Sequence, residues 1–421
     1  MNELRRNWAG NIRYASARVH HPESIEQVQE IVARSRKVKV FGARHSFNAI
    51  TDTTEEQICL DKMDQSLSID QTGQSVTVSG GITYGQLCTQ LDKAGRALHN
   101  MASLPHISVA GAVATATHGS GDGNGNLATA VTALELVRAD GEIVTLSRQK
   151  DGETFLGAVV NLGALGVVTR MALETQPAFV MQQEVYERLP LAQAEAHFDA
   201  IFSSAYSVSF FTDWQEESIN QVWLKRHLAD GSGLTPAPTF YGGALATRHL
   251  HPLKRLSADP CTPQMGIPGP WQTRLPHFLI DHAPASGDEL QAEYFVDRKY
   301  AVAALAAVAR LRRELGPVLI LSEIRSVAAD SLWMSTAYEQ ATIGIHFSLN
   351  NDWPSVRGLL PLIEKQLAPF QPRPHWGKLF TMPGEQIQAR YPKLHEFRAL
   401  AQAFDPQGKF RNDYLDATIF A

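Results

Sequence analysis

Hydrophobic side chains between about residue 20 and residue 175 recur with the periods of both helices and strands. After Ser24, apolar residues follow every three or four positions as far as Val32, which predicts a capped amphipathic helix. A second helix is predicted from residue 83 to residue 94, because Gly95 suits the position that follows a helix. These helices, with the strands described next, predict an α+β first part of the chain.

Strand patterns complete this first part. Residues 38–41 alternate before a glycine, and an apolar run at residues 167–173 closes the region. Residues 131–138 and 142–147 lie on either side of an Asp-Gly step, which favours the tight turn of a hairpin. We therefore expect these two segments to pair as antiparallel strands.

The pattern changes after this first part. Strand patterns at residues 206–211, 221–226 and 291–296 alternate with helical ones, notably residues 300–315. Residues 231–287 are dense in Pro and Gly, which predicts a long surface loop or lid. These features indicate a second domain.

The chain is accordingly divided into three parts. Residues 1–176 are expected to form the first domain, and residues 177–372 the second. Residues 373–421 are too short to fold alone. We expect this last segment to pack back onto the first domain or across the domain junction.

Composition narrows the class of protein. The 421 residues are 44% hydrophobic and 19% charged, with a formal net charge of -5, which is typical of a soluble protein of two or three domains. The basic residues are scattered, whereas a nucleic-acid groove needs a basic stripe, so no nucleic-acid partner is expected. No run of eighteen uncharged apolar residues occurs, and we expect no membrane segment and no apolar leader. The expectation is a cytoplasmic monomer.

Cysteine and histidine spacings predict neither disulfides nor a metal site. Cys59, Cys88 and Cys261 are odd in number and unrelated in spacing, so we expect three reduced thiols. His249 and His251 lack a carboxylate or further histidine at helical spacing and are followed by proline. No metal is expected.

A histidine, His45, follows the predicted strand at residues 38–41. A single histidine in such a position is more often structural than a point of cofactor attachment. Gly42, however, has no Cβ, so the backbone can turn there and approach a ligand closely. Successive N–H groups in such a turn form a concave site that suits a diphosphate.

Small residues dominate residues 103–121, so the backbone there can pass against a flat or bulky ligand. A tightly packed internal loop would explain the same composition. The glycine cluster at residues 121–125 neither follows a hydrophobic strand nor opens a helix. A Rossmann-type nicotinamide site is therefore not expected.

Two predicted strands of the second domain carry polar side chains. In residues 319–327, Glu323 and Arg325 lie two positions apart and project from one face together with apolar side chains. A solvated ion pair would stabilise the fold by less than about 1 kcal/mol and would need no function. The apolar neighbours argue against a wholly solvated face, and a polyhydroxylated ligand is one suitable partner.

The second of these strands, residues 341–350, alternates cleanly between apolar and polar positions. Taken alone, it favours a solvent-facing sheet surface. The polar face would carry Thr342, His346, Ser348 and Asn350.

Five segments of the chain resemble, in order and spacing, those of the alditol oxidases (xylitol and sorbitol oxidases). They are more distantly similar to the sugar-lactone oxidases, and both groups belong to the flavoproteins of the vanillyl-alcohol-oxidase type. The similarity extends from Trp8 to about Tyr414. The segments are residues 42–47, 102–111, 322–325, 346–348 and 374–378.

This resemblance implies an α+β fold of two domains, a vanillyl-alcohol-oxidase-type FAD-binding domain and an α/β cap domain over the substrate. It also implies FAD bonded covalently through His45. Many relatives have glycine where this chain has Arg44, which could support the diphosphate or disturb the linkage. The residues implied to bind the cofactor are Phe41, Gly42, Ala43, Arg44, His45, Ser46, Ser103, Ser108, Gly111, Ala112, Val113, Ala114, Thr115, His118 and Val167.

The resemblance further implies a substrate site beneath the cap. Ser103 would lie beside both flavin and substrate, and His346 would face the carbon to be oxidised. The implied reaction takes a terminal CH₂OH of a polyol to the aldehyde by hydride transfer to FAD, with O₂ then reduced to hydrogen peroxide. The residues implied to bind the substrate are Ser103, Glu323, Arg325, His346, Ser348 and Lys378.

Three of these residues suit catalysis. A hydride leaving an unactivated alcohol produces a developing alkoxide, which the cations Arg325 and Lys378 would stabilise. His346 is the candidate base by type, since the usual pKa of histidine is about 6.5. Which group takes the proton stays open. A sugar-1,4-lactone oxidase and a non-catalytic flavoprotein are the alternatives.

Overall fold

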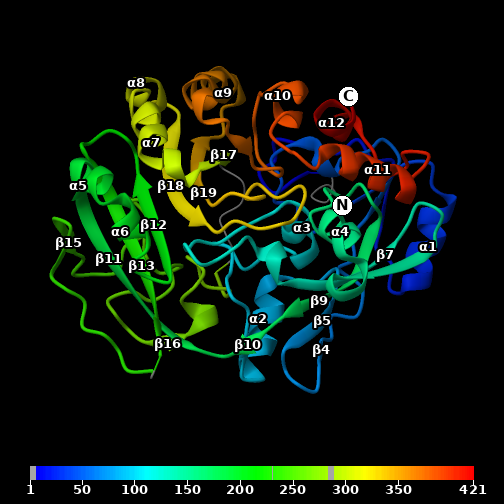
Figure 1. Cartoon of the computed structure of the whole chain (residues 1–421), viewed down its shortest axis with the longest axis horizontal. Coiled ribbons are helices and arrows are strands. Elements are labelled where there is room, and N and C mark those ends of the chain that lie inside the picture. The colour runs from blue at the N-terminus through cyan, green and yellow to red at the C-terminus, as the bar shows by residue number, and fades with distance from the viewer. Residues whose placement is uncertain (1–5, 230, 283–288) are drawn as a thin grey trace.

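The computed structural model describes residues 6–229, 231–282 and 289–421. Residues 1–5 of the first expected domain, and residues 283–287 of the predicted loop, lie outside this description. Two sheet-containing bodies stand side by side in Figure 1, with the early strands on the right and the later ones on the left.

The first body is built on an antiparallel sheet with strand order β4-β5-β9-β7-β8. The hairpin of β7 and β8 is the one that the Asp-Gly step predicts. A smaller parallel sheet has the order β1-β3-β2. The strands are β1 (Arg18–His20), β2 (Val38–Val40), β3 (Glu56–Ile58), β4 (Ser68–Ile69), β5 (Ser75–Ser79), β7 (Val131–Val137), β8 (Ile143–Ser147) and β9 (Val167–Glu174).

Both helices predicted for this body form. In α1 (Ile25–Arg34), the Ser24 hydroxyl accepts from the backbone N–H of Gln27, and the apolar stripe is buried. In α2 (Tyr84–Lys93), Thr83 and Gln86 form a capping box, and Gly95 follows with a φ of 69°. The remaining elements here are β6 (Arg96–Ala97), β10 (Gln176–Pro177), α3 (Val109–Ala114) and α4 (Arg148–Val159).

The second body contains a large sheet with the order β14-β15-β11-β13-β12-β18-β19-β17-β20. Helices α7 and α9 pack against each other and against β17. The strands are β11 (Val180–Pro190), β12 (Ser207–Thr212), β13 (Ser218–Leu228), β14 (Thr239–Phe240), β15 (Gly243–Leu245), β16 (Gly269–Pro270), β17 (Glu289–Asp297), β18 (Leu319–Val327), β19 (Thr342–Asn350) and β20 (Arg373–Pro374). The helices are α5 (Leu191–Ala196), α6 (Phe198–Phe202), α7 (Ala301–Ala309), α8 (Arg312–Leu315) and α9 (Trp353–Leu367).

Two details differ from the sequence patterns. The single helix predicted for residues 300–315 is divided into α7 and α8 at Arg310 and Leu311. The predicted loop of residues 231–287 is largely irregular, but it contributes the short strands β14, β15 and β16 to the large sheet.

The C-terminal segment bridges the two bodies. Strand β20 pairs with β17 of the large sheet. Further on, the Lys409 ammonium donates to the carbonyls of Val32 and Ala139 in the first body, each at 2.7 Å. The segment also contains α10 (Gly384–Gln388), α11 (Leu394–Phe404) and α12 (Asp413–Leu415).

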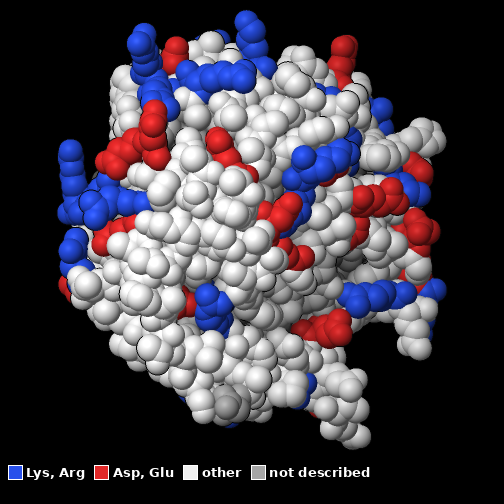
Figure 2. Space-filling view, turned by 60° about the vertical axis from the view of Figure 1, so that its left-hand side comes forward, with Lys and Arg blue, Asp and Glu red and all other residues white. Residues whose placement is uncertain are grey.

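The surface adds two observations. On the face shown in Figure 2, acidic and basic side chains are interspersed and form no basic stripe. Among the described residues, no helix is both long and apolar enough to span a bilayer.

Candidate active site

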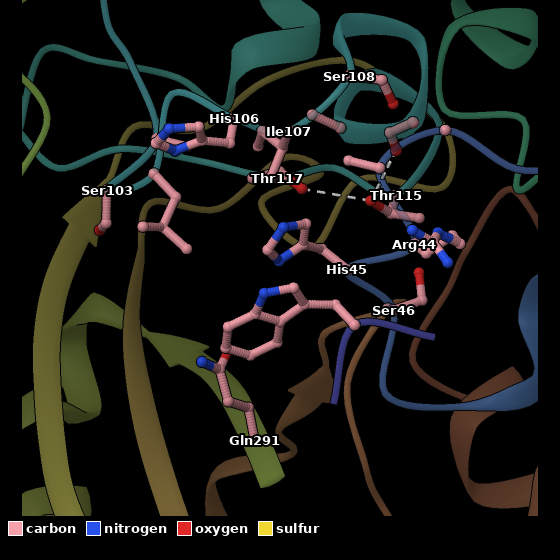
Figure 3. Close-up of a pocket in the computed structure, with 18 of the residues that line it drawn as sticks. Arg44, His45, Ser46, Ser103, His106, Ile107, Ser108, Thr115, Thr117 and Gln291 are labelled. Atoms are coloured by element: carbon pink, nitrogen blue, oxygen red, sulfur yellow. Dashed lines mark hydrogen bonds between the residues drawn. The ribbon is translucent and has the colours of Figure 1, made fainter. Parts of the chain in front are cut away.

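A cavity of about 1330 Å³ is lined by residues of both bodies. The loops at residues 41–47 and 102–118 line it together with strands β17, β18 and β19 (Figure 3). Sites for small molecules usually measure roughly 300–1,000 Å³, so this cavity has room for a large cofactor and a second ligand.

The two loops of the first body are held in close contact at Gly42. A Cβ atom placed on Gly42 would fall 1.9 Å from Ser108 Oγ, and one on Gly111 would fall 2.7 Å from the same atom. The sequence suggested that Gly42 permits close approach of a ligand. In the structure, the close neighbour is the Ser108 side chain, so the glycine allows the loops to meet.

Arg44 adopts a backbone conformation that favours glycine. Its φ is 60°, and the left-handed region costs most other residues roughly 1–2 kcal/mol. Its carbonyl accepts from the Trp8 N–H at 2.8 Å, and its guanidinium donates to the Arg6 carbonyl at 3.2 Å. The turn itself therefore favours glycine at this position. A left-handed residue in such a turn also suits an anion-binding arrangement of N–H groups.

His45 projects into the cavity, where its ring stacks on Trp8 with centroids 4.9 Å apart (Figure 3). Burial, with smaller contributions from the nearby His106 and Arg44 side chains, lowers the pKa of His45 to about 4. The imidazole is therefore neutral near pH 7, and a ring nitrogen lone pair is available for bond formation.

Hydroxyl groups surround one end of the cavity. In Figure 3, Ser46, Ser108 and Thr115 lie to one side of the His45 ring, and Ser103 lies to the other. The Thr115 hydroxyl donates to the Gly111 carbonyl at 2.9 Å. Hydroxyls and turn N–H groups are the donors that a diphosphate requires, so this end of the cavity fits FAD.

Most residues implied to bind the cofactor line the cavity, but two do not. The Val113 and Val167 side chains are buried in hydrophobic clusters away from its lining. The lining includes Phe41, Gly42, Ala43, Arg44, His45, Ser46, Ser103, Ser108, Gly111, Ala112, Ala114, Thr115 and His118.

The other end of the cavity is formed by strands of the large sheet. Glu323 and Arg325 on β18 are both buried, and Arg325 Nε lies 3.4 Å from Glu323 Oε1. Arg325 also donates to Ser103 Oγ at 3.3 Å across the junction. The interpretation as a solvated surface ion pair is therefore wrong.

Strand β19 is also buried where it faces the cavity. Pairing with β18 places His346 directly opposite Glu323. His346 and Ser348 are each only 8% exposed and Thr342 is fully buried, so the solvent-facing surface favoured for this strand alone is wrong for these three residues. Asn350, at the end of the strand, is exposed.

Glu293 on β17 stands at the centre of this end, and the sequence analysis missed it. Its carboxylate is buried and accepts from Lys378 Nζ at 2.6 Å, Arg325 at 3.1 Å and His118 Nε2 at 3.0 Å. The sequence pattern that could have revealed Glu293 is the alternation of side chains along a strand, which places Glu289, Gln291 and Glu293 on one face.

His277 was missed as well, because it lies in the irregular Pro-rich region. Its Nε2 lies 2.7 Å from Glu323 Oε1. Burial lowers the pKa of His277 to about 4, so this neutral ring donates to the carboxylate. Burial alone would raise the pKa of Glu323, but Arg325 and His277 hold it well below its usual range.

Lys378 and His346 form a bonded pair beside Glu293. Lys378 Nζ lies 2.8 Å from His346 Nδ1, and His346 Nε2 lies 3.2 Å from Ser348 Oγ. Burial, reinforced by the Lys378 charge, lowers the pKa of His346 to about 4. Burial also lowers the pKa of Lys378, and the Glu293 carboxylate opposes that shift. The Glu293 and Glu323 carboxylates thus balance the Arg325 and Lys378 cations.

The thiols and the remaining histidines show one unexpected grouping. Cys59, Cys88 and Cys261 are free and buried. Within the described part of the chain, ligand atoms of His21, Cys59 and Asp61 lie within 4.8 Å of one another. The 2.6 Å contact of His21 Nδ1 with Asp61 accounts for part of this grouping. Such groups are common without an ion, so it establishes no metal site.

Two family models match the chain. An FAD binding domain matches residues 16–147, which contain the His45 loop and the hydroxyl-lined end of the cavity. A D-arabinono-1,4-lactone oxidase model matches residues 288–418, which contain Glu293, β18, β19 and Lys378.

Relatives match along nearly the whole chain. An alditol oxidase of Streptomyces sp. is 45% identical over 97% of both chains. An L-gulono-1,4-lactone dehydrogenase of Mycobacterium tuberculosis is 29% identical over 98% of both. A solvent-stable cholesterol oxidase shares the fold, with a TM-score of 0.77 and 16% identity over 98% of this chain and 96% of that one. The chain therefore belongs to the alditol oxidase family of FAD-dependent oxidoreductases, with the vanillyl-alcohol-oxidase-type fold of an FAD-binding domain and a cap domain.

Proposed function

We propose that this protein oxidises the terminal primary hydroxyl of alditols such as xylitol and sorbitol to the aldose, with O₂ reduced to hydrogen peroxide. The observation that carries the proposal is the buried cluster of Glu293, Glu323, Arg325 and Lys378, which faces the same cavity as the His45 loop. The 45% identity to an alditol oxidase supports this choice of substrate class.

FAD would occupy the hydroxyl-lined end, bonded covalently through an imidazole nitrogen of His45. Bound FAD supplies a hydride acceptor whose electrons can pass to O₂. The neutral state of His45 supports a covalent bond, because only the unprotonated ring has a free lone pair. The stack on Trp8 holds the ring within the cavity.

The substrate would lie between Ser103 and the strands of the large sheet. The Glu323 carboxylate would accept from a substrate hydroxyl, and Ser348 would bond another. Arg325 and Lys378 would stabilise negative charge on the reacting oxygen as it develops, which is worth more in a buried site than in water. His346 would lie beside the reacting carbon and take part in moving the hydroxyl proton.

A sugar-1,4-lactone oxidase is the second candidate, and the match of residues 288–418 to a lactone oxidase model favours it. The two differ in a direct assay. Purified protein would be given xylitol, sorbitol and a galactonolactone in air, and peroxide would be measured. We expect the higher kcat/KM with the polyols, and a preference for the lactone would contradict the proposal. No peroxide with any of them would favour a non-catalytic flavoprotein.

The linkage has its own test. Acid precipitation should leave the flavin in the protein pellet, and the protein mass should exceed the sequence mass by one FAD. Flavin found wholly in the supernatant would contradict the covalent bond and leave the FAD site untouched.

The remaining proposals concern organisation. Residues 1–176 would form the FAD-binding domain, residues 177–372 the cap domain and residues 373–421 the segment returning to the junction. The bonds of Lys409 to Val32 and Ala139 support the last assignment. We also propose that the protein is cytoplasmic, and the three free thiols support this compartment. We further propose that it is a monomer, and light scattering would measure its mass in solution.

A further inference from the structure

The irregular region between β13 and β17 reaches the substrate end of the cavity at His277. The backbone N–H of His277 donates to the Ser103 carbonyl of the first body at 3.1 Å. Its side-chain Nε2 lies 2.7 Å from Glu323 Oε1 on the large sheet. His277 therefore joins the two bodies at the cavity, and the proposed reaction leaves it without a role.

His277 completes a ring of four residues at this end of the cavity. Glu323 Oε1 lies 3.4 Å from Arg325 Nε, and Arg325 Nη1 donates to Ser103 Oγ at 3.3 Å. The bond from the His277 N–H to the Ser103 carbonyl closes the ring. All four side chains line the cavity. Three of them are in the proposed substrate site, and His277 is the addition.

The tautomer of His277 follows from its partner. Burial lowers the pKa of His277 to about 4, so the ring is neutral at physiological pH. An ionised carboxylate only accepts hydrogen bonds, so the proton of this ring lies on Nε2 and is donated to Glu323. The buried Trp223 and Phe211 rings pack edge-on against the imidazole, with centroids 5.2 Å and 5.4 Å away, and exclude water from it.

The two oxygens of the Glu323 carboxylate have different surroundings. The contacts with His277 Nε2 and Arg325 Nε are both made by Oε1. Oε2 accepts no hydrogen bond from the residues that the structure describes. A carboxylate that is bonded through Oε1 to a positioned donor cannot rotate without breaking a charge-assisted bond. Oε2 is thus the oxygen left to accept from a ligand in the cavity.

Lys225 on β13 holds the backbone that carries His277. Its buried Nζ donates to the carbonyls of Leu275 and Pro276 at 2.6 Å and 2.7 Å. Thr262 adds a bond from its hydroxyl to the Pro276 carbonyl and one from its N–H to the His277 carbonyl, each at 2.9 Å. Three consecutive carbonyls are therefore bonded, which fixes the direction in which the imidazole leaves the backbone.

We propose that His277 is a positioning residue that selects one oxygen of Glu323 for the substrate. Its Nε2 occupies Oε1, and Oε2 accepts from a polyol hydroxyl beyond the reacting carbon, while Lys225 positions His277 in turn. The inference rests on the proposed alcohol oxidation. Such a hydroxyl bond is present both before and during hydride transfer. It therefore stabilises the bound substrate and the transition state alike, and it controls affinity more than the limiting rate.

Reduction of the flavin without oxygen, across xylitol concentrations, separates affinity from rate. His277→Phe keeps a ring and removes the donor, so the half-saturating concentration should rise about 10-fold while the limiting rate stays within about 3-fold. His277→Gln keeps an N–H donor and should restore most of the affinity. His249→Phe, at an exposed position of the same region, is the control. Unchanged affinity in His277→Phe, or an equal loss in His277→Gln, would overturn the proposal.

A measurement without turnover checks the geometry. Proton–nitrogen spectra of the oxidised protein with labelled histidine should show a neutral ring protonated at Nε2, with that proton shifted downfield by its bond to a carboxylate. The signal should be absent from His277→Phe, which assigns it. It should move upfield in Glu323→Gln, whose amide oxygen carries no charge. A His277 ring protonated at Nδ1, or a signal that ignores Glu323→Gln, would overturn the proposal.

Lys225→Met leaves the imidazole and the carboxylate in place and removes the bonds to the backbone. We expect a smaller rise in the half-saturating concentration, about 3-fold, together with a shifted Nε2 proton. Wild-type affinity with an unshifted proton would overturn the role of Lys225. Losses that follow the melting temperatures of the variants, and not the Nε2 signal, would indicate a purely structural role. A wild-type flavin that no polyol reduces would contradict the proposed function, whereas the spectra judge His277 separately.

Discussion

The two ends of the cavity are formed by different kinds of secondary structure. The cofactor end consists of loops of the first body, with hydroxyls, glycines and a left-handed turn at Arg44. The substrate end consists of paired strands that carry buried carboxylates and cations. Loops present many backbone donors to an extended, invariant ligand. Strands hold a few side chains rigidly, which charge stabilisation in a transition state requires.

The two ends also carry different energetic costs. The cofactor end contains backbone strain at Arg44, whereas the substrate end contains the desolvation of four charged groups. Truncation of one member of a buried ion pair commonly costs about 3–5 kcal/mol of stability, because the partner is left uncompensated, whereas a replacement that keeps a polar group in place costs less. We therefore expect substitutions at the substrate end to have the larger effects, and mainly on rate rather than on FAD binding.

Lys378→Met should give the largest effect. In the proposed reaction the ammonium stabilises the developing charge on the substrate oxygen, and it bonds both Glu293 and His346. Its loss should leave FAD bound and oxidised, while anaerobic reduction by saturating xylitol slows by about 10²–10³-fold, the effect of removing one transition-state donor. Rapid-mixing absorbance would measure it. Lys365→Met, at an exposed position, is the control. Unchanged reduction would remove Lys378 from the mechanism.

Glu323→Gln and Arg325→Lys should give intermediate effects. Lysine cannot reproduce the planar guanidinium that reaches Ser103, Glu293 and Glu323 together. Each variant should lose transition-state stabilisation of about 1–3 kcal/mol, measured as kcat/KM, with a melting temperature within a few degrees of wild type. Unfolding of either variant with normal kinetics in the soluble fraction would indicate a structural ion pair instead.

The pH dependence of stability gives Glu323 a second test. The pKa of Glu323 in the folded protein lies well below its unfolded value of about 4.3. Its ionised form therefore stabilises the fold above the unfolded pKa, and this contribution is lost as pH falls through the folded pKa. The difference in unfolding free energy between wild type and Glu323→Gln should shrink in acid. A difference that grows in acid would contradict the ion pairing.

These two ends were not equally predictable. Hydrophobic periods and caps located α1, α2 and the β7–β8 hairpin, because such signals lie within one element. Family motifs located the His45 loop and the Glu323-Ile324-Arg325 step. Glu293 and Glu289 were missed because their meaning depends on which strands pair with β17, and strand pairing is a long-range property.

Two further misses have local causes. His277 lies in an irregular region that has no periodic sequence pattern, so its position depends on tertiary packing. The positive φ of Arg44 could not be predicted from the sequence, because an arginine does not indicate a left-handed backbone conformation. A glycine there would have been the readable signal.

At the cofactor end, His45→Ala should abolish covalent attachment while the fold remains. FAD should then bind reversibly and be released by acid precipitation. Since the pKa of His45 is about 4, attachment of FAD to wild-type apoprotein should proceed equally well from about pH 6 to about pH 8. A bond that persists in His45→Ala would place the linkage elsewhere, and His249→Ala, at a ring distant in sequence, serves as the control.

The smallest effect should come from Arg44, which tests whether the cofactor end contains strain rather than charge. Arg44→Ala removes the guanidinium and keeps the Cβ, whereas Arg44→Gly removes both. Relief of the left-handed penalty, roughly 1–2 kcal/mol, is partly offset by the greater freedom of glycine in the unfolded chain. We therefore expect Arg44→Gly to be the more stable of the two by about 1 kcal/mol in denaturant unfolding, with covalent FAD retained in both. If Arg44→Ala is as stable as Arg44→Gly, strain at this turn is negligible. The energetic costs of the two ends then differ only in the desolvation of the charged groups.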